Sequence, residues 1–371
     1  MRIGLNLLPV VAGIGGARQY IANLVGALAT HDGNNDYVVF TTRASASLVP
    51  SASNFKIIEV PLHASLRPLR VAYESIILPQ LNRGQGLDCV HHFFGTLPFF
   101  GREPTVVTVL DMMPFDRPRD FHFVKRAYVR SMRRRAASHA TMLTPMSNAT
   151  ADRLHDILGV ASERMIVVPP IVPSAYSART KSDVDSFRTR RDLHGDFWLY
   201  VAGPYPHKNI SRLIDAFVDL RKRLGAGWPL VIRADSTDAL AKQVARTQLS
   251  NQIRFIPRLA DDEMPLLYSA ASALVFPSLY EGGGLPVLEA MACGCPVIAS
   301  NLPATREFAG GAARTFNPED VADISRAMEG CERSAELRAV ISAHGLARAT
   351  RFTPSAAASA CVAAYRVAVT R

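Results

Sequence analysis

The chain has 371 residues, more than one ordinary hydrophobic core supports, and this length fits two domains of common size. With 48% hydrophobic and 20% charged residues it has a globular composition, which excludes a disordered or fibrous protein, and no apolar run reaches the ~18 residues that span a bilayer. The formal net charge of +10 indicates an acidic partner, and nucleic acid, an anionic membrane and a phosphorylated substrate all qualify.

The first half alternates short β-like runs with longer helical ones, a pattern typical of parallel sheets in α/β layers. Strands are expected at residues 2–8, 37–42, 56–60, 88–93, 105–111, 139–146 and 165–170, and helices at residues 16–31, 70–82 and 123–138. The apolar run at the N-terminus is short and is broken by Asn6 and Pro9, so we interpret it as a first strand and its turn rather than as a signal peptide.

Residues 169–190 are rich in proline, serine and charge, and we interpret them as a linker. A second α/β series follows, with strands expected at residues 197–203, 229–235, 252–257, 272–278 and 295–300, and helices beginning near Ser211, Thr237, Asp261 and Leu285. The sequence therefore predicts two consecutive α/β domains, residues 1–178 and 179–371, with a ligand cleft at the carboxyl ends of their strands. A last helix at about residues 355–369 is expected to pack back across the linker.

The five cysteines are odd in number and scattered, so no disulfide framework is expected. Cys293 and Cys295 are too close together for a zinc-binding pair, and no second pair accompanies them. The cysteines therefore predict a reducing cytoplasm and no metal site.

The stretch YEGGGLPVLE, at residues 280–289, places three glycines between a strand-like and a helix-like run. Pro286 suits the first turn of a helix, because its missing N–H costs nothing there. The backbone N–H groups of Gly283, Gly284 and Leu285 then point out of the helix N-terminus. Such a helix end is a binding site for an anion, and the absent side chains let a phosphate or a sugar come close.

Two carboxylates, Glu281 and Glu289, flank this glycine turn. A carboxylate is a natural acceptor for a pair of sugar hydroxyls. The alternative is a flexible turn in which Glu289 merely complements the helix dipole.

The longer stretch EGGGLPVLEAMACGCPVIAS resembles the signature of the retaining family-4 glycosyltransferases of the GT-B fold: a glutamate, seven residues, a second glutamate, a small-residue helix and a Pro-Val-Ile strand. The resemblance implies two Rossmann-like domains that face each other across a cleft, with the acceptor on the N-terminal domain and a nucleotide sugar on the C-terminal one. It also implies that Glu281 contacts the donor-sugar hydroxyls and Glu289 the ribose, while the N–H groups between them hold the sugar and diphosphate. Gly283 departs from the family, which usually has Phe there, and this change widens the pocket.

Lys208, in YVAGPYPHKNISRLIDAF, follows a strand and opens a helix, where a lysine meets a diphosphate as a point charge. This stretch resembles the family's Arg-Lys-Asn or Arg-Lys-Gly segment, with His207 in place of the common arginine. Arg212, Arg233 and Arg258 are candidates to assist Lys208. The alternative is a solvated lysine near a helix start.

A second glycine-rich turn, GIGGARQ, follows the first strand. Interpreted as a dinucleotide fingerprint that starts Gly13-x-Gly15, it has Arg18 where the third glycine belongs, which disfavours an oxidoreductase. The resemblance implies instead that the loop, Gly15 and Gly16 especially, closes over the donor phosphate.

Asp111 ends the strand expected at residues 105–111 and is predicted to face the cleft. The resembling family usually has His-Asp here, and Leu110 replaces the histidine. Asp111 is then a catalytic candidate beside Glu281 and Lys208, with the role of orienting the acceptor. The alternative is an aspartate that caps a turn or a helix. His91 and His92 end another strand and either face the cleft or are structural.

Residues 123–138 are expected to form an amphipathic helix with a basic arc of Lys125, Arg126, Arg130, Arg133 and Arg134 and an apolar arc of Val124, Tyr128, Met132 and Ala136. Basic amphipathic helices bind anionic membranes, at ~1 kcal/mol per basic residue near the surface. Arg67 and Arg70, beside apolar residues, are a second candidate for contact with lipid or acceptor. The alternative for the basic helix is a solvated helix face. No nucleic acid is expected, because no aromatic-studded basic sheet or recognition-helix module is evident.

These features predict a cytoplasmic retaining hexosyltransferase, peripheral on the inner face of the cytoplasmic membrane and independent of metal. It would transfer a hexose from a nucleotide sugar to a lipid-linked bacterial glycan. Mannose from GDP-mannose is expected because the pattern resembles that of bacterial O-antigen mannosyltransferases, while UDP- and dTDP-linked sugars stay open. The alternatives are a nucleotide-sugar epimerase of the same fold and a non-catalytic nucleotide-sugar-binding subunit, which the missing histidine at Leu110 favours.

Overall fold

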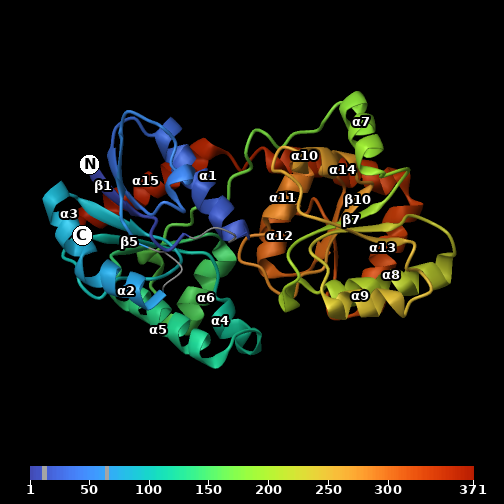
Figure 1. Cartoon of the computed structure of the whole chain (residues 1–371), viewed down its shortest axis with the longest axis horizontal. Coiled ribbons are helices and arrows are strands. Elements are labelled where there is room, and N and C mark those ends of the chain that lie inside the picture. Colours follow the sequence, from blue (N-terminus) through green and yellow to red (C-terminus); the bar gives the residue numbers. More distant parts are fainter. Residues whose placement is uncertain (11–14, 63–66) are drawn as a thin grey trace. The chain divides into compact units, whose positions relative to one another are not determined.

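Strands and helices alternate along residues 1–10, 15–62 and 67–371, which the computed structural model describes, and the strands pair in parallel in two six-stranded sheets (Figure 1). Gly13 of the fingerprint interpretation lies outside these residues. The chain divides into one unit of Met1–Ile171 with Phe352–Arg371 and a second unit of Val172–Arg351. The last helix thus belongs to the first unit, as the sequence predicts.

The first unit has the strand order β3-β2-β1-β4-β5-β6, the doubly wound order of dinucleotide-binding folds. Its strands are β1 (Arg2–Asn6), β2 (Asp36–Thr41), β3 (Phe55–Glu59), β4 (Cys89–His92), β5 (Thr105–Val109) and β6 (Met142–Pro145). Its helices are α1 (Gly15–His31), α2 (Arg67–Ile76), α3 (Leu78–Gln85), α4 (Met113–Asp116), α5 (Phe123–His139), α6 (Asn148–Leu158) and α15 (Pro354–Thr370).

The second unit repeats this topology, with the order β12-β11-β10-β7-β8-β9. Its strands are β7 (Trp198–Val201), β8 (Leu230–Arg233), β9 (Ile253–Ile256), β10 (Ala273–Phe276), β11 (Val297–Ser300) and β12 (Arg314–Phe316). Its helices are α7 (Lys181–Arg191), α8 (Ile210–Leu224), α9 (Asp238–Ala245), α10 (Met264–Ala270), α11 (Leu285–Ala292), α12 (Pro303–Ala309), α13 (Val321–Arg333) and α14 (Ala335–Ala349).

The β7 strand shows how the second unit builds a core on both faces of its sheet. Leu199 and Val201 pack in one buried cluster with residues of α10 and α11, while Trp198 and Tyr200 pack in another with residues of α8 and α13. Because successive strand side chains point to opposite faces, a strand covered on both faces is apolar throughout. Figure 1 shows the two helix layers on either side of β7 and β10.

Helix α15 closes the first unit by packing against α1 and the sheet (Figure 1). Its Tyr365 hydroxyl lies 2.8 Å from Nδ1 of buried His91, whose Nε2 lies 2.6 Å from Thr108 Oγ1. Thr108 in turn bonds Thr144 Oγ1 at 2.8 Å. A ladder of hydrogen bonds thus crosses β4, β5 and β6 beneath α15, and His91 is structural.

Three sequence expectations are wrong, each for a local reason. The expected linker contains helix α7, which begins after Thr180, whose side chain accepts from the Asp183 N–H, and which buries Phe187. The helix expected at residues 70–82 is split into α2 and α3, because Pro79 has no N–H with which to continue it. The strand expected at residues 165–170 is reduced to one bridge between Met165 and Leu143.

No helix within the described residues combines the length and the apolar character needed to cross a bilayer. All five cysteines are free and buried.

The Tyr365 bond to His91 gives a stability prediction. Tyr365→Phe removes the hydroxyl partner of buried His91 Nδ1 and leaves it only the weak contact to Cys361 Sγ at 3.9 Å, which costs about 1–3 kcal/mol. Hydrogen exchange should show lost protection in α15 and β4. Tyr205→Phe, at a side chain that is 60% exposed, is the control and should leave exchange unchanged. Unchanged protection of α15 in Tyr365→Phe contradicts the prediction.

Candidate functional site

Strands β7 and β10 are neighbours at the centre of the second sheet, and their chains then continue to opposite sides of it. In open parallel sheets ligands bind at the carboxyl ends of strands, at such a switch point. The loop after β7 carries Lys208 and the loop after β10 carries Glu281 and the glycines. The topology therefore gathers the sequence-predicted donor residues at one edge of the second unit.

Hydrogen bonds tie these two loops together. The Leu279 N–H donates to the carbonyl of His207 at 2.7 Å. Asn209 is buried with φ 62°, and its Nδ2 donates to the carbonyls of Pro277 and Pro318 at 2.9 and 2.8 Å. Asparagine tolerates this left-handed conformation better than most side chains, and here it fixes the position of the preceding lysine.

Lys208 and Glu281 form a close ion pair, with 2.6 Å between Nζ and Oε1. Both side chains are largely buried, at 17% and 9% exposed. Lys208 Nζ also lies 5.6 Å from the centre of the Phe276 ring. A positive and a negative group are thus fixed next to each other, with little water to screen them.

The N-terminus of α11 lies next to Glu281 in the chain and is open. Gly284 has φ 83°, a left-handed conformation that favours glycine, and it caps the helix without a side-chain bond. Within the described residues no hydrogen bond is donated by the N–H groups of Gly283, Gly284 or Leu285. Pro286 lies in the first turn, where it has no N–H to leave unpaired. This is the anion-binding geometry that the sequence predicts.

Glu289 is buried within α11, and its Oε2 accepts a hydrogen bond from the Tyr268 hydroxyl at 2.9 Å. Burial raises its pKa to about 7, while the Tyr268 bond and the charge of Arg233 oppose that rise. Tyr176 packs 6.2 Å from Tyr268, ring centre to ring centre. Sequence reasoning missed both tyrosines, because Tyr268 lies in an apolar helix like a core residue and Tyr176 lies in the stretch interpreted as a linker.

Of the three arginines considered as helpers of Lys208, only one is close enough to Glu289 to influence its charge. Arg233, at the end of β8, lowers the pKa of Glu289. Its Nε is buried and has no hydrogen-bond partner within the described residues. Arg212 instead bonds Asn209 Oδ1 at 3.0 Å, and Arg258 is exposed.

The remaining predicted residues lie in the first unit. Gly15 and Gly16 are the exposed first residues of α1. Asp111 follows β5, and its Oδ1 accepts from the Met113 N–H at 3.0 Å and lies 3.7 Å from Arg133 Nη2. The Asp111 side chain is 35% exposed, so the carboxylate caps a turn and still reaches solvent.

Helix α5 is less basic on its surface than the sequence predicts. Arg133 is 5% exposed and packs on Gly95, where it donates to the Phe94 carbonyl at 3.2 Å. Val124, which the sequence places on the apolar arc, is 58% exposed. Arg133 is therefore not part of an exposed basic arc, because a glycine at position 95 makes room for its guanidinium inside.

Among the described residues, no group of three or more histidine, cysteine, aspartate or glutamate side chains is arranged to hold a metal ion.

The buried Glu289 gives a prediction of pH dependence. In the unfolded chain the carboxyl ionises near pH 4.5, whereas in the folded protein it keeps its proton to about pH 7. The contribution of Glu289 to the free energy of unfolding therefore falls as pH rises from 4.5 to 7, by up to about 3 kcal/mol. The melting temperature of Glu289→Gln should accordingly rise relative to wild type across this range.

The control is Glu319→Gln, at an exposed glutamate of the same unit, which should show a constant difference from wild type. A pH-independent difference for Glu289→Gln contradicts the raised pKa.

Two family models and several known proteins match this chain. Residues 14–176 match the family Glycosyltransferase Family 4, and residues 182–348 match Glycosyl transferases group 1. The O-antigen chain mannosyltransferase B of Escherichia coli is 25% identical over 99% of this chain and 100% of its own.

Solved structures show the same fold at low identity. Sucrose-phosphate synthase from Thermosynechococcus elongatus has a TM-score of 0.79 and 17% identity over 99% of this chain and 98% of its own. Anabaena HepE in complex with UDP-glucose has a TM-score of 0.74 and 18% identity over 97% of each chain. The matched families and the shared topology identify the chain as a family-4-like glycosyltransferase of the GT-B fold that resembles the O-antigen mannosyltransferases.

Proposed function

We propose that the chain is a retaining mannosyltransferase of O-antigen synthesis, which moves mannose from GDP-mannose to a hydroxyl of a lipid-linked glycan. The observation that carries the proposal is the Lys208–Glu281 pair, 2.6 Å apart, beside the open N-terminus of α11. The full-length similarity to the Escherichia coli O-antigen mannosyltransferase supports the sugar and the pathway.

The chemistry follows from where charge develops. As the bond to the sugar breaks, negative charge builds on the departing diphosphate. The Lys208 ammonium and the N–H groups of Gly283 and Gly284, which bond no described residue, are fixed sources of positive charge, which stabilise this transition state electrostatically. These groups supply what a divalent cation supplies in other transferases, so we propose metal-independent transfer.

Besides its ion pair with Lys208, Glu281 binds the donor sugar in this proposal. Its carboxylate accepts hydrogen bonds from the sugar hydroxyls while the sugar becomes oxocarbenium-like. The acceptor then attacks on the face that the diphosphate leaves, so no enzyme nucleophile takes part. Asp111, with its exposed carboxylate at the end of β5, is proposed to orient the acceptor hydroxyl.

We assign nucleotide recognition to Glu289, whose carboxylate is proposed to accept hydrogen bonds from the two ribose hydroxyls. Its burial excludes competing water, and the Tyr268 bond fixes its orientation. Gly15 and Gly16, exposed at the start of α1, are proposed to cover the donor phosphate. The UDP-glucose bound by Anabaena HepE supports a nucleotide-sugar donor for this fold. Thermal stabilisation tests the base: GDP should raise the melting temperature more than UDP, dTDP or ADP.

Mutation of the ion pair tests the proposed catalysis. Lys208→Ala and Glu281→Gln should each lower kcat for mannose transfer by about 100-fold or more, since one electrostatic group in a transition-state site contributes about that much. Lys242→Ala, at an exposed lysine of α9, is the matched control and should retain activity. Turnover of either variant within threefold of wild type rules out the assigned roles.

The two rival functions give different products in the same assay. An epimerase converts GDP-mannose without an acceptor, and a binding subunit is stabilised by nucleotide but gives neither transfer nor donor hydrolysis. Leu110, where the family has histidine, is 7% exposed and packs as a core residue. We therefore propose that transfer proceeds without an imidazole at this position.

The first unit also has features of a membrane-binding surface. Phe123 and Val124 at the start of α5 are 65% and 58% exposed, and Lys125 and Arg134 on the same helix are exposed cations. Leu69 and Ile76 of α2 are each 53% exposed, and Ile77 beyond it is 37% exposed. We propose that exposed apolar side chains and cations together bind the anionic lipid that carries the acceptor.

Vesicle binding tests this surface. The protein should bind phosphatidylglycerol vesicles and not phosphatidylcholine vesicles, and Phe123→Glu should weaken binding by at least about fivefold through lost apolar burial and added repulsion. Val340→Glu, at a 46% exposed side chain of α14, is the control in the other unit. Equal loss in both variants, or no binding by wild type, contradicts the proposal.

A further inference from the structure

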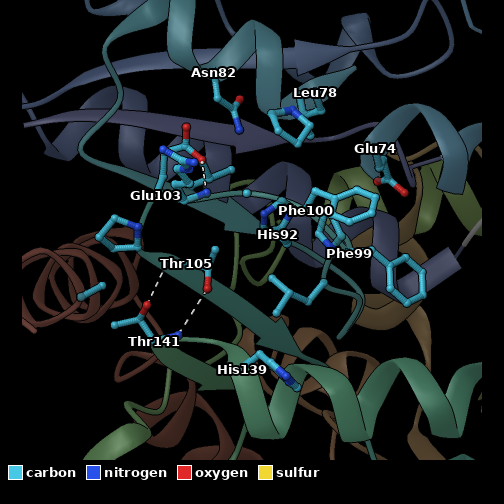
Figure 2. Close-up of a pocket in the computed structure, with 18 of the residues that line it drawn as sticks. Glu74, Leu78, Asn82, His92, Phe99, Phe100, Glu103, Thr105, His139 and Thr141 are labelled. Carbon is cyan, nitrogen blue, oxygen red and sulfur yellow. Dashed lines mark hydrogen bonds between the residues drawn. The ribbon is translucent and has the colours of Figure 1, made fainter. Parts of the chain in front are cut away.

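In the part of the chain that the structure describes, strand β4 of the first sheet has no helix over one of its faces. On this face Leu78 of α3 packs against β2, and Ala136 of α5 packs with Val107 of β5, in two separate buried clusters. Strand β4 lies between β1 and β5, and the chain passes from β4 to β5 through residues 93–104 without forming a helix. A pocket of about 520 Å³ fills the gap, lined by α3, α5 and this connection (Figure 2).

The connection is held rigidly in place. Phe94 and Gly95 both have left-handed backbone, with φ of 65° and 63°, which turns the chain sharply after β4. Further along, Arg135 donates to the Phe99 carbonyl at 2.8 Å and lies 4.8 Å from the centre of its ring. Ser75 of α2 accepts from the Phe99 N–H at 3.3 Å. A non-glycine residue in this conformation is strained, so the surrounding contacts must hold the connection in this shape.

One buried group in the pocket lacks a partner. Asn82 is 4% exposed, and its Oδ1 has no hydrogen bond within the described residues. Figure 2 shows its side chain reaching from α3 toward the connection that carries Glu103. Because an unpaired buried acceptor costs about 1–3 kcal/mol, a ligand that donates a hydrogen bond there is favoured.

Two further polar side chains share the pocket. Glu74 is 6% exposed, and its Oε1 accepts from Asn6 Nδ2 at 2.9 Å. The same Nδ2 lies 3.1 Å from Nδ1 of His92, which orients that imidazole. An amide, a carboxylate and an imidazole thus line one cavity, and each can bond a hydroxyl, which both donates and accepts.

We propose that this pocket is a second carbohydrate site, which binds sugar residues of the acceptor chain; the proposal rests on the proposed function. Phe99 and Phe100, 47% and 66% exposed, offer ring faces to the apolar C–H faces of pyranose rings, while the buried polar groups bond their hydroxyls. A lipid chain is disfavoured, because it would leave the buried Asn82 amide oxygen without a hydrogen-bond donor.

The shape of the pocket indicates a chain rather than a single sugar. Along β4 it reaches from Val90, which pairs with Thr105 at the start of β5, to His92, a span of about 7 Å. In the other direction it extends past β5 to Thr141, just before β6. With a volume of about 520 Å³ the pocket takes a ligand larger than one sugar, so we expect it to hold sugars in series.

Calorimetry on the full chain without donor tests this site, with linear mannose oligosaccharides of one to four residues. The tetrasaccharide should bind more tightly than the monosaccharide. Phe100→Ala should weaken tetrasaccharide binding about tenfold, whereas Phe123→Ala, which is equally exposed in wild type, should not change it. Asn82→Leu should weaken it about tenfold without lowering the melting temperature, because it removes an unpaired buried acceptor.

Wild-type binding that is absent, or that is unchanged in Phe100→Ala and Asn82→Leu, overturns the proposal. So does a Phe100→Ala protein that loses phosphatidylglycerol vesicles but keeps the oligosaccharide, since the occupant is then lipid. Failure of the proposed function is separate: Lys208→Ala should lose transfer and retain oligosaccharide binding. Binding by a wild-type protein that transfers no mannose would support the carbohydrate site and reject the proposed transferase.

Discussion

The donor half of the molecule depends on one constraint, the divergence of two adjacent parallel strands. Strands β7 and β10 run side by side, but the chain leaves β7 toward β8 and leaves β10 toward β11, so their loops meet with no strand between them. Two left-handed residues make the meeting possible. Asn209 ties the first loop to the second, and Gly284 turns the second loop into α11, whose first N–H groups bond no residue that the structure describes. The short distance from Lys208 to Glu281 is a consequence of this topology.

The same region carries a cost that core packing alone does not explain. A carboxyl at Glu289 is buried in an apolar helix, and burial raises its pKa to about 7. An apolar residue would make α11 more stable, because a buried carboxylate loses hydration that one tyrosine bond does not replace. Residues that violate the rules of stability are expected at functional sites. The cost of burying Glu289 is therefore consistent with its proposed contact to the hydroxyl groups of a ligand.

Sequence reasoning predicts what local patterns determine. The alternation of strands and helices, the glycine turn and the Glu281–Glu289 spacing are all properties of adjacent residues, and the structure has the predicted α/β layers. It fails where partners are distant. Arg133 looked like a surface cation on its own helix, but it packs on Gly95, which lies on another element. Tyr268 could not be assigned to the site, because only the packing of α10 on α11 brings its hydroxyl to Glu289.

The two units share one strand order, but they differ in one connection between neighbouring strands. In the second unit helix α11 links β10 to β11, and its N-terminus is the proposed anion site. The corresponding strands of the first unit, β4 and β5, are joined without a helix, so the face of β4 is open to a ligand. The proposed phosphate site uses N–H groups at a helix end, whereas the proposed glycan site uses Asn82 and His92, which line the pocket left by the missing helix. A single topology can therefore supply sites for both a charged donor and a neutral glycan, according to whether one crossover helix is present.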